Sequence, residues 1–255
     1  MKTVFVGQGL VAGVLSPVLR EAGHVVLARE RLPDADVVFV TVPDDLIYEV
    51  AGRIATELRC DQGVVHCSGV TEVSVLMSAV PGLTRIGGFH PLINFASPNV
   101  QELIAGSAVA IEAEPSFERE LLALASDLRL RPIQLSAGGR PLYHAAITLL
   151  GYAGPSAMGS ALAIWSSIGL EGEIAREVLE QFLKGVQFGQ GAGLSGPVAR
   201  ADVGTIRLHR RALSALVRPE YWSEYRAAVQ LQLEQADFFG LLPPDKIALL
   251  RQAIA

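Results

Sequence analysis

The chain has 255 residues, of which 50% are hydrophobic and 18% are charged. Its 21 Lys and Arg and 26 Asp and Glu give a net charge of −5, which excludes the overall basic surface of a nucleic-acid-binding protein. The length predicts one or two domains that need no disulfide or metal to fold. Two cysteines, Cys60 and Cys67, are too few for a disulfide framework, and the first residues, 1–4, are predicted as a strand rather than a signal peptide. Both features favour a cytoplasmic location.

The first half of the chain alternates short apolar runs with helical patterns, which is typical of a parallel α/β sheet. Strands are predicted at 4–6, 24–28, 37–42, 64–67, 85–89, 108–112 and 132–135. Helices are predicted at 10–22, 44–58, 71–79 and 117–128. Gly23 is expected to end the first of these helices, and Asp44 is expected to cap the second.

After Gly138 and Gly139 the pattern is helical to the end of the chain. Helices are predicted at 141–169, 172–189, 203–217, 219–239 and 244–254, with breaks at Gly169, at 189–193, at Pro219 and at 243–244. The sequence therefore predicts an α/β domain at 1–138 and an all-helical domain at 139–255.

One stretch of the helical half has no charged side chain. No Asp, Glu, Lys or Arg occurs between Arg140 and Glu171. The stretch is long enough to cross a bilayer, but small residues such as Gly151 and Gly159 interrupt it and no Lys/Arg cluster flanks it. We therefore expect a buried helix of the helical domain and no membrane span. Because this helix is too apolar all round to face water, it also predicts a homodimer formed through the helical domain.

A glycine-rich loop follows the first strand and opens the first helix, with the pattern G-x-G-x-x-A. In dinucleotide-binding folds the first glycine permits a tight turn, the second lets the backbone approach the pyrophosphate, and the third small residue lets helix and strand pack closely. Free N–H groups at the helix N-terminus then bind the phosphates. A plain βαβ turn that uses glycine only for its geometry is the alternative. The pattern predicts a cofactor-binding loop made of Gly7, Gln8, Gly9, Leu10, Val11 and Ala12.

The second strand ends at Ala28 and is followed by Arg29, Glu30 and Arg31, where NAD-binding proteins carry an acidic residue for the ribose 2′-hydroxyl. Arg29 and Arg31 favour a 2′-phosphate and hence NADP, Glu30 keeps NAD possible, and simple solvation of both arginines is the alternative. Only eight residues separate Ala28 from Val37, too few for the usual crossover helix and third strand. The sequence predicts that both are deleted and that the chain steps over the first strand to its other side.

Further segments carry a resemblance to a known family. They are 42–45, 66–69, 89–92, 142–146, and 196–202 together with Thr205 and His209. Together they resemble a family of bacterial oxidoreductase-like proteins, related to the 6-phosphogluconate dehydrogenase-like group that includes ketopantoate and pyrroline-5-carboxylate reductases. The resemblance implies a Rossmann-like parallel sheet, a helical C-terminal domain of unassigned function, NADP binding and dimerisation. With the deletion inferred above, the predicted fold is a trimmed Rossmann-like parallel sheet followed by a helical C-terminal domain. This chain departs from the family in the deleted helix and strand, and in Tyr152, where the family usually has Asn.

Candidate site residues follow from position and from this resemblance, because ligands of open α/β sheets bind beyond the carboxyl ends of the strands. Related reductases often use a Lys on the interdomain helix as proton donor, and this helix has none. His144 at its start is therefore predicted as the donor, since an ordinary imidazole pKa of about 6.5 suits proton transfer. We assign Val42, Pro43 and Asp44 to the cofactor, Ser68, His90 and His144 to the reaction, and His66, Tyr152 and Arg200 to the substrate.

Each assignment has a structural alternative. The histidines could instead make structural hydrogen bonds, and Arg200 could pair with Asp202. Cys67 is better interpreted as a small buried residue than as a nucleophile, and no ligand spacing supports a metal site. The sequence thus predicts an NAD(P)-dependent oxidoreductase acting on a small carbonyl or imine metabolite. The alternative is a non-catalytic nucleotide- or metabolite-binding protein on a degenerate Rossmann fold.

Overall fold

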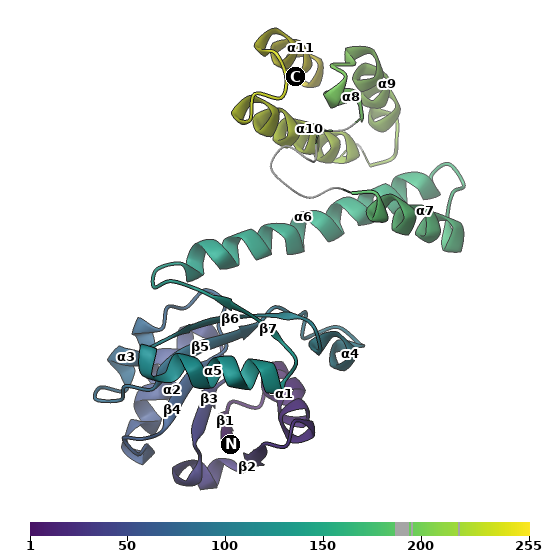
Figure 1. Ribbon diagram of the computed structural model, residues 1–255. Helices are drawn as coiled ribbons and strands as arrows, with labels where there is room; N and C mark the ends of the chain where they lie inside the picture. The colour runs from purple at the N-terminus through teal and green to yellow at the C-terminus, as the bar shows by residue number, and fades with distance from the viewer. Residues whose placement is uncertain (187–193, 195, 219) are drawn as a thin grey trace. The chain divides into compact units, whose positions relative to one another are not determined.

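Figure 1 shows a computed structural model of the chain, which describes residues 1–186, 194, 196–218 and 220–255. Contacts divide the chain into two units, Met1–Thr148 and Leu149–Ala255. The division falls inside the long helix α6 (Arg140–Ser166), beyond the boundary at residue 138 expected from the sequence. The first turns of α6 are grouped with the α/β unit because they pack against its sheet.

The first unit is built on a seven-stranded sheet of order β2-β1-β3-β4-β5-β6-β7. Strands β1 to β5 are parallel to their neighbours, β6 is antiparallel to β5, and β7 is parallel to β6. The strands are β1 (Lys2–Val6), β2 (Val25–Leu27), β3 (Val37–Val40), β4 (Gly63–His66), β5 (Ile86–Pro91), β6 (Ala108–Ala113) and β7 (Arg131–Gln134).

This mostly parallel sheet confirms the predicted Rossmann-like class, with one correction. The last two strands run in the opposite direction, although the sequence predicted a wholly parallel sheet. The physical reason lies in the link after β5, which holds only the short helix α4 (Val100–Ile104). The chain does not return to the other end of the sheet, and Val109 of β6 pairs directly with Pro91 at the end of β5.

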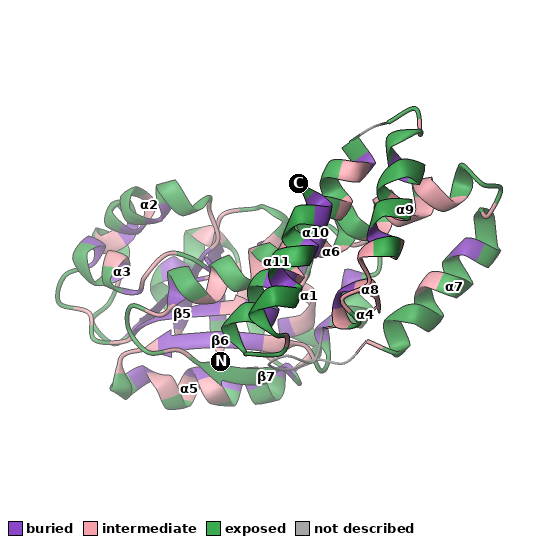
Figure 2. Cartoon of the chain, turned by 90° about the horizontal axis from the view of Figure 1, so that it is seen from above, coloured by how far each residue is buried: buried purple, intermediate pink, exposed green. Residues whose placement is uncertain are grey.

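Helices cover both faces of the sheet because side chains alternate along each buried strand. Phe39 packs on the face covered by α1 (Leu10–Glu21), α4 and α5 (Pro115–Asp127). Val38 and Val40 pack on the face covered by the 3₁₀-helix η1 (Arg29–Asp34), α2 (Ile47–Ile54) and α3 (Ser74–Ala79). Figure 2 shows the buried strands β5 and β6 between these layers. The continuous apolar runs of the sequence reflect this burial on two faces.

The connection after β2 confirms the predicted deletion. The single 3₁₀-helix η1 replaces the usual crossover helix. Strand β3 then pairs with β1 on the side away from β2, with Val37 opposite Thr3. Strand β2 is thereby left at the edge of the sheet.

The predicted cap at Asp44 is wrong. The helix expected at 44–58 is divided into the 3₁₀-turns η2 (Asp44–Leu46) and η3 (Ala55–Glu57) on either side of α2. Pro43 and not Asp44 is the N-cap of η2, and no side-chain capping hydrogen bond forms there within the described chain. The backbone closes the turn instead, since the N–H of Leu46 donates to the carbonyl oxygen of Pro43 at 2.9 Å.

The second unit is helical. After α6 come α7 (Gly172–Lys184), α8 (Gly196–Ala199), α9 (Val203–Ser214), α10 (Glu220–Phe238) and α11 (Pro244–Ile254). Helices α8 to α11 enclose a small apolar core that contains Ile206, Leu233 and Leu250. The described residues of this unit form no strand, as predicted. The predicted breaks at 189–193 and at Pro219 lie outside the described residues.

Helix α6 is not buried within this chain. Of its 27 residues only Arg140 is buried, whereas Leu142 is 78% and Leu150 is 75% exposed. The expectation of a helix buried inside the helical domain is therefore wrong for a single chain, because the core of that unit forms among α8 to α11. By length and composition, α6 is the one helix of the described chain that could cross a membrane.

Candidate functional site

The glycine loop has the geometry of a phosphate cradle. Gly7 ends β1 with φ +120°, and a Cβ there would overlap the carbonyl oxygen of Thr41. A Cβ on Gly9, the N-cap of α1, would have no atom within 4 Å, so a large group can approach the backbone. Among the described residues no side chain caps the first N–H groups of α1. The loop therefore fits the pyrophosphate of a dinucleotide.

Thr41 is a functional candidate that the sequence analysis missed. Its hydroxyl donates a hydrogen bond to the carbonyl oxygen of Gly7 at 3.2 Å, which ties the loop to the end of β3. The only sequence signal is a hydroxyl residue directly after a buried strand. Such residues are common, so position alone does not distinguish this one.

A cavity of about 370 Å³ lies beside the loop, between Gln8, the face of α1 that carries Arg20, and strand β2 with Arg29. Arg29 binds Glu57 through two hydrogen bonds of 2.9 and 2.8 Å. Arg31, in the same 3₁₀-helix, pairs with Asp34 at 2.8 Å. Both arginines assigned to the 2′-phosphate thus already have carboxylate partners. Arg20, which the sequence analysis did not single out, forms no ion pair within the described chain.

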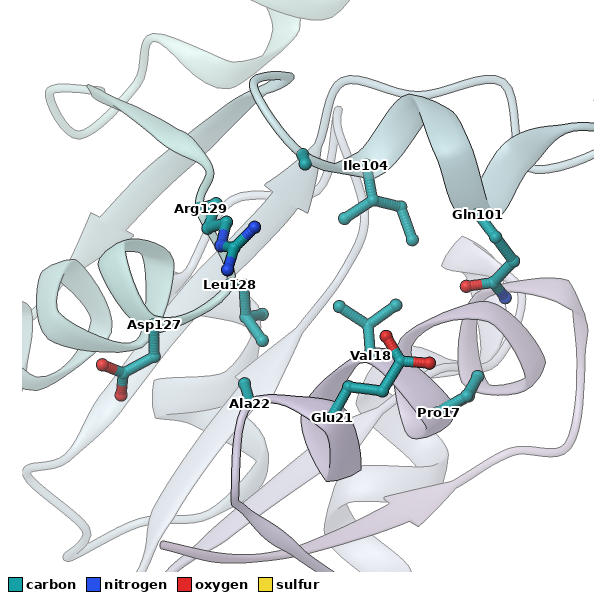
Figure 3. A pocket seen from close by; sticks show the side chains of 10 residues that line it. Pro17, Val18, Glu21, Ala22, Gln101, Ile104, Asp127, Leu128 and Arg129 are labelled. Atoms are coloured by element: carbon teal, nitrogen blue, oxygen red, sulfur yellow. The ribbon is translucent and has the colours of Figure 1, made fainter.

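A larger cavity of about 570 Å³ lies elsewhere in the first unit (Figure 3). It is bounded by the end of α1, by α4 and by the end of α5, and its ionisable side chains are Glu21, Asp127 and Arg129. None of the residues assigned to the cofactor, the reaction or the substrate lines it. The candidate chemistry is therefore not located in this cavity.

The remaining candidates of the α/β unit follow the ends of strands β3, β4 and β5. Val40 at the end of β3 is in register with His66 at the end of β4, and His66 with Gly88 of β5. Residues 42–44, His66, Ser68 and His90 therefore lie at the sheet edge that also carries the glycine loop, because these strands are parallel to β1. This edge of the sheet thus carries the glycine loop, the three cofactor candidates 42–44 and the two reaction candidates Ser68 and His90.

Three side chains form a compact cluster at this edge. The Tyr143 hydroxyl lies 3.1 Å from His90 Nδ1, and the two rings are nearly perpendicular at 5.8 Å between centroids. The ring of His144 lies 6.0 Å from that of His90. A Cβ on Gly69 would lie 2.5 Å from His144 Cδ2 and 2.9 Å from His90 Nε2, so the loop after β4 packs directly against both rings. All four residues belong to the first unit.

Arg140 anchors the helix that carries this cluster. It is fully buried, with Nε 2.6 Å from Glu112 Oε2 and Nη1 donating to the carbonyl oxygen of Ser68 at 2.6 Å. A Cβ on Gly88 would overlap the guanidinium, so this glycine makes room for it. The sequence marked Arg140 only as the last charge before the apolar stretch, because its partners are distant along the chain.

Burial makes two of the histidines poor bases. Burial, together with the smaller effect of the positive charge of Arg140, lowers the pKa of His66 to about 3 and that of His90 to about 4. Both rings are therefore neutral at pH 7. Burial also raises the pKa of Cys67 to about 12, so its thiol stays protonated, which argues against a nucleophile. The side chain is partly buried against the core.

His66 ends β4, and Ser68 lies in the turn that follows it. His66 is fully buried, and its ring nitrogens have no partner within the described chain. The Ser68 hydroxyl accepts backbone hydrogen bonds from Val70 at 3.2 Å and Thr71 at 2.9 Å. It therefore closes the turn after β4, which holds Gly69 against the histidines.

The other two substrate candidates lie in the second unit. Tyr152 is 73% exposed on α6, and Arg200 is exposed after α8. Asp202 caps α9, accepting hydrogen bonds from the Thr205 N–H at 3.0 Å and hydroxyl at 2.7 Å. The described residues show no ion pair between Asp202 and Arg200, which leaves the Arg200 guanidinium exposed.

We compared the chain with known families, curated proteins and solved structures. Residues 107–231 match the family described as Domain of unknown function (DUF2520), and no curated protein matches the chain. A structure from Thermotoga maritima has a TM-score of 0.66 and 21% identity, over 92% of this chain and 98% of that one. An imine reductase from Pseudomonas sp. has a TM-score of 0.66 and 14% identity, over 100% and 99%. Pyrroline carboxylate reductase from Plasmodium falciparum, solved with NADP bound, has a TM-score of 0.61 and 13% identity, over 92% and 98%.

These structural similarities establish the fold, and they agree with the resemblance found in the sequence motifs. Residues 107–231 therefore match the model of the DUF2520 family, and the chain as a whole has the fold of these solved structures, a Rossmann-like α/β half followed by a helical half.

Proposed function

We propose that this protein is an oxidoreductase that uses a nicotinamide dinucleotide to reduce or oxidise a small carbonyl or imine compound. The observation that carries the proposal is one shared sheet edge. The glycine loop 7–12 and the cluster of His90, Tyr143 and His144 both lie at the carboxyl ends of parallel strands of one sheet. In open α/β sheets this edge is where nucleotide and substrate meet.

The chain itself would supply binding, orientation and proton transfer. When bound, the nicotinamide supplies or accepts the hydride. The N–H groups at the start of α1 bind the pyrophosphate. His90 is neutral at pH 7, so it suits hydrogen bonding to the substrate better than proton donation. The half-buried His144 lies beside His90 and would donate the proton to the substrate.

A fluorescence titration with NADPH tests the first step. Saturable binding below millimolar concentration supports the proposal, and no binding at millimolar cofactor would refute it. Turnover is then measured over a panel of keto acids and imines. Oxidation of NADPH with any member identifies the class of substrate.

We further propose NADP rather than NAD as the cofactor, with Arg29 exchanging Glu57 for the 2′-phosphate. Because the Arg29–Glu57 pair is partly exposed, the exchange does not uncover a buried charge. Glu57→Gln should then raise the affinity for NADPH and leave that for NADH unchanged. Arg29→Asp should erase or reverse the preference. Arg53→Gln, at an exposed arginine paired with Glu49, is the matched control. Equal affinities of the parent protein for the two cofactors would overturn the preference.

A non-catalytic binding protein is the second candidate. It is favoured by the missing crossover helix and by the carboxylate partners of Arg29 and Arg31. It predicts that cofactor or another nucleotide binds without turnover of any carbonyl or imine substrate. The same titration and panel distinguish it from the enzyme.

We also propose that a second copy of the chain covers α6. The helix exposes large apolar side chains, and a Cβ on Gly151, Gly154 or Gly159 would meet no atom within 4 Å. Small residues of this kind let a second helix approach closely. A membrane span is less consistent with the buried ion pair of Arg140 and Glu112 at the start of the helix.

A further inference from the structure

Tyr143 has no role in the proposed chemistry, yet it makes the one side-chain hydrogen bond that His90 forms in the described chain. Its hydroxyl lies 3.1 Å from His90 Nδ1. Burial raises the pKa of Tyr143, so the hydroxyl keeps its proton. A phenol O–H is more acidic than the N–H of a neutral imidazole, which favours Tyr143 as the donor and Nδ1 as the acceptor.

A neutral imidazole that accepts a hydrogen bond at one nitrogen carries its proton on the other. His90 then bears its proton at Nε2. This nitrogen faces Gly69, with no hydrogen-bond partner within the described chain. Because Gly69 has no side chain, the space in front of Nε2 is kept clear of any Cβ. His90 Nε2–H is thus a free donor in the cluster that also holds His144.

The position of Tyr143 is fixed by the first turn of α6. Its backbone N–H donates to the carbonyl oxygen of Gly139 at 3.0 Å. One turn earlier, Arg140 is held by Glu112 and by the carbonyl oxygen of Ser68. The tyrosine hydroxyl therefore meets His90 from a helix end that is tied to the sheet by a buried ion pair.

We propose that Tyr143 is a positioning residue that fixes His90 as the Nε2–H tautomer, so that His90 donates a hydrogen bond to the oxygen or nitrogen of a carbonyl or imine substrate. The identity of the acceptor rests on the proposed function. The tautomer is a property of the protein without ligands. A neutral imidazole in this state polarises a carbonyl group without giving up its proton.

Long-range ¹H–¹⁵N correlation spectra of the ¹⁵N-labelled full chain at pH 7 test the tautomer directly. In the parent protein we expect His90 to show a protonated Nε2 and an unprotonated Nδ1. Tyr143→Phe keeps the ring and removes the hydroxyl, so it should admit the second tautomer and move the two ¹⁵N shifts toward each other. A protonated Nδ1 in the parent protein, or unchanged shifts in the variant, would overturn the proposal.

Tyr225→Phe is the matched control. The Tyr225 hydroxyl lies 2.8 Å from His209 Nδ1 in the second unit, so this variant removes the same kind of hydrogen bond from another histidine. It should change the signals of His209 and leave those of His90 in place. Circular dichroism checks that both variants fold, and movement of the His90 signals in the control would count against a specific role of Tyr143.

Turnover adds a second readout once a substrate of the panel is found. Tyr143→Phe should lower kcat by about 10- to 100-fold, because loss of a residue that orients a functional imidazole typically has an effect of this size. KM and the affinity for NADPH should be nearly unchanged. An unchanged kcat would overturn the role in positioning. If the parent protein binds no NADPH but shows the expected tautomer, the proposed function fails while the role of Tyr143 in fixing the ring stands. If it binds NADPH but carries the proton on Nδ1, only the tautomer proposal fails.

Discussion

Replacing Arg140 by leucine removes the positive charge that pairs with Glu112. It also removes the hydrogen bond that the guanidinium donates to the carbonyl oxygen of Ser68. The Glu112 side chain is 10% exposed and that of Arg140 is 0% exposed, so the remaining carboxyl group stays largely out of water. Breaking a buried ion pair from one side costs about 3–5 kcal/mol. Because burial already raises the pKa of Glu112, this carboxyl group can take up a proton. We therefore expect a loss near the lower value, about 3 kcal/mol.

Urea unfolding measures this loss, and the chain offers a probe for each unit. Trp165 and Trp222 both lie in Leu149–Ala255, so tryptophan fluorescence reports on the second unit, whereas far-UV circular dichroism reports on both. With a denaturant slope of about 2 kcal/mol/M, a loss of about 3 kcal/mol lowers the urea midpoint by about 1.5 M. Arg140→Leu should move the dichroism transition of the first unit by this amount and leave the fluorescence transition in place.

The double variant Arg140→Leu/Glu112→Leu separates the ion pair from the space it fills. Replacing both charges of a buried pair by apolar side chains is often neutral or stabilising, so most of the lost stability should return. A midpoint shift below about 0.5 M in the single variant would refute the reasoning. A double variant no more stable than the single one would show that the loss comes from packing.

Three further predictions concern His144, the buried histidines and the oligomeric state. His144→Asn should lower turnover by about 10²–10⁴-fold with cofactor binding and stability nearly unchanged, and full activity or unfolding would mark His144 as structural. His66 and His90 have folded pKa values of about 3 and about 4 against about 6.5 unfolded, so the unfolded chain binds more protons below pH 6.5. Stability should fall from pH 6.5 toward pH 4 by up to about 1.4 kcal/mol per pH unit for each ring, and equal urea midpoints at pH 7 and pH 5 would contradict this. Light scattering at micromolar concentration should give twice the mass of the chain, and a monomer would argue against the proposed cover of α6.

The strands and helices of the first unit could be predicted because their residues are buried in a regular pattern. Val37–Val40 is buried on both faces, and such runs are visible in the sequence itself. The short link between Ala28 and Val37 likewise predicts that β3 pairs with β1 on the side away from β2. The reversed direction of β6 was not predictable, since it depends on whether the chain crosses the sheet after Pro91 and no local pattern records that.

The candidate site likewise has a part that could be predicted from the sequence and a part that could not. Residues at strand ends, such as His90, could be found from position, but their partners could not. Tyr143 is 53 residues from His90, and Glu112 is 28 residues from Arg140, so neither pair leaves a spacing to recognise. The exposure of α6 could not be predicted for another reason. An apolar helix is expected to be covered, but its composition does not indicate whether the same chain or a second chain covers it.

The two borders of the seven-stranded sheet have a bearing on aggregation. A strand at the border of a sheet, called an edge strand, has unpaired backbone N–H and C=O groups to which a strand of another chain can hydrogen-bond. One border is β2, which has only three residues. The other is β7, where the N–H groups of Arg131 and of Leu135, just after the strand, point inward and donate to the carbonyl oxygens of Ser107 and Ile111. By alternation the position of Pro132 faces outward, and proline has no N–H to offer there. Both borders are therefore poor templates, which protects a chain that has to fold a large sheet at cellular concentration.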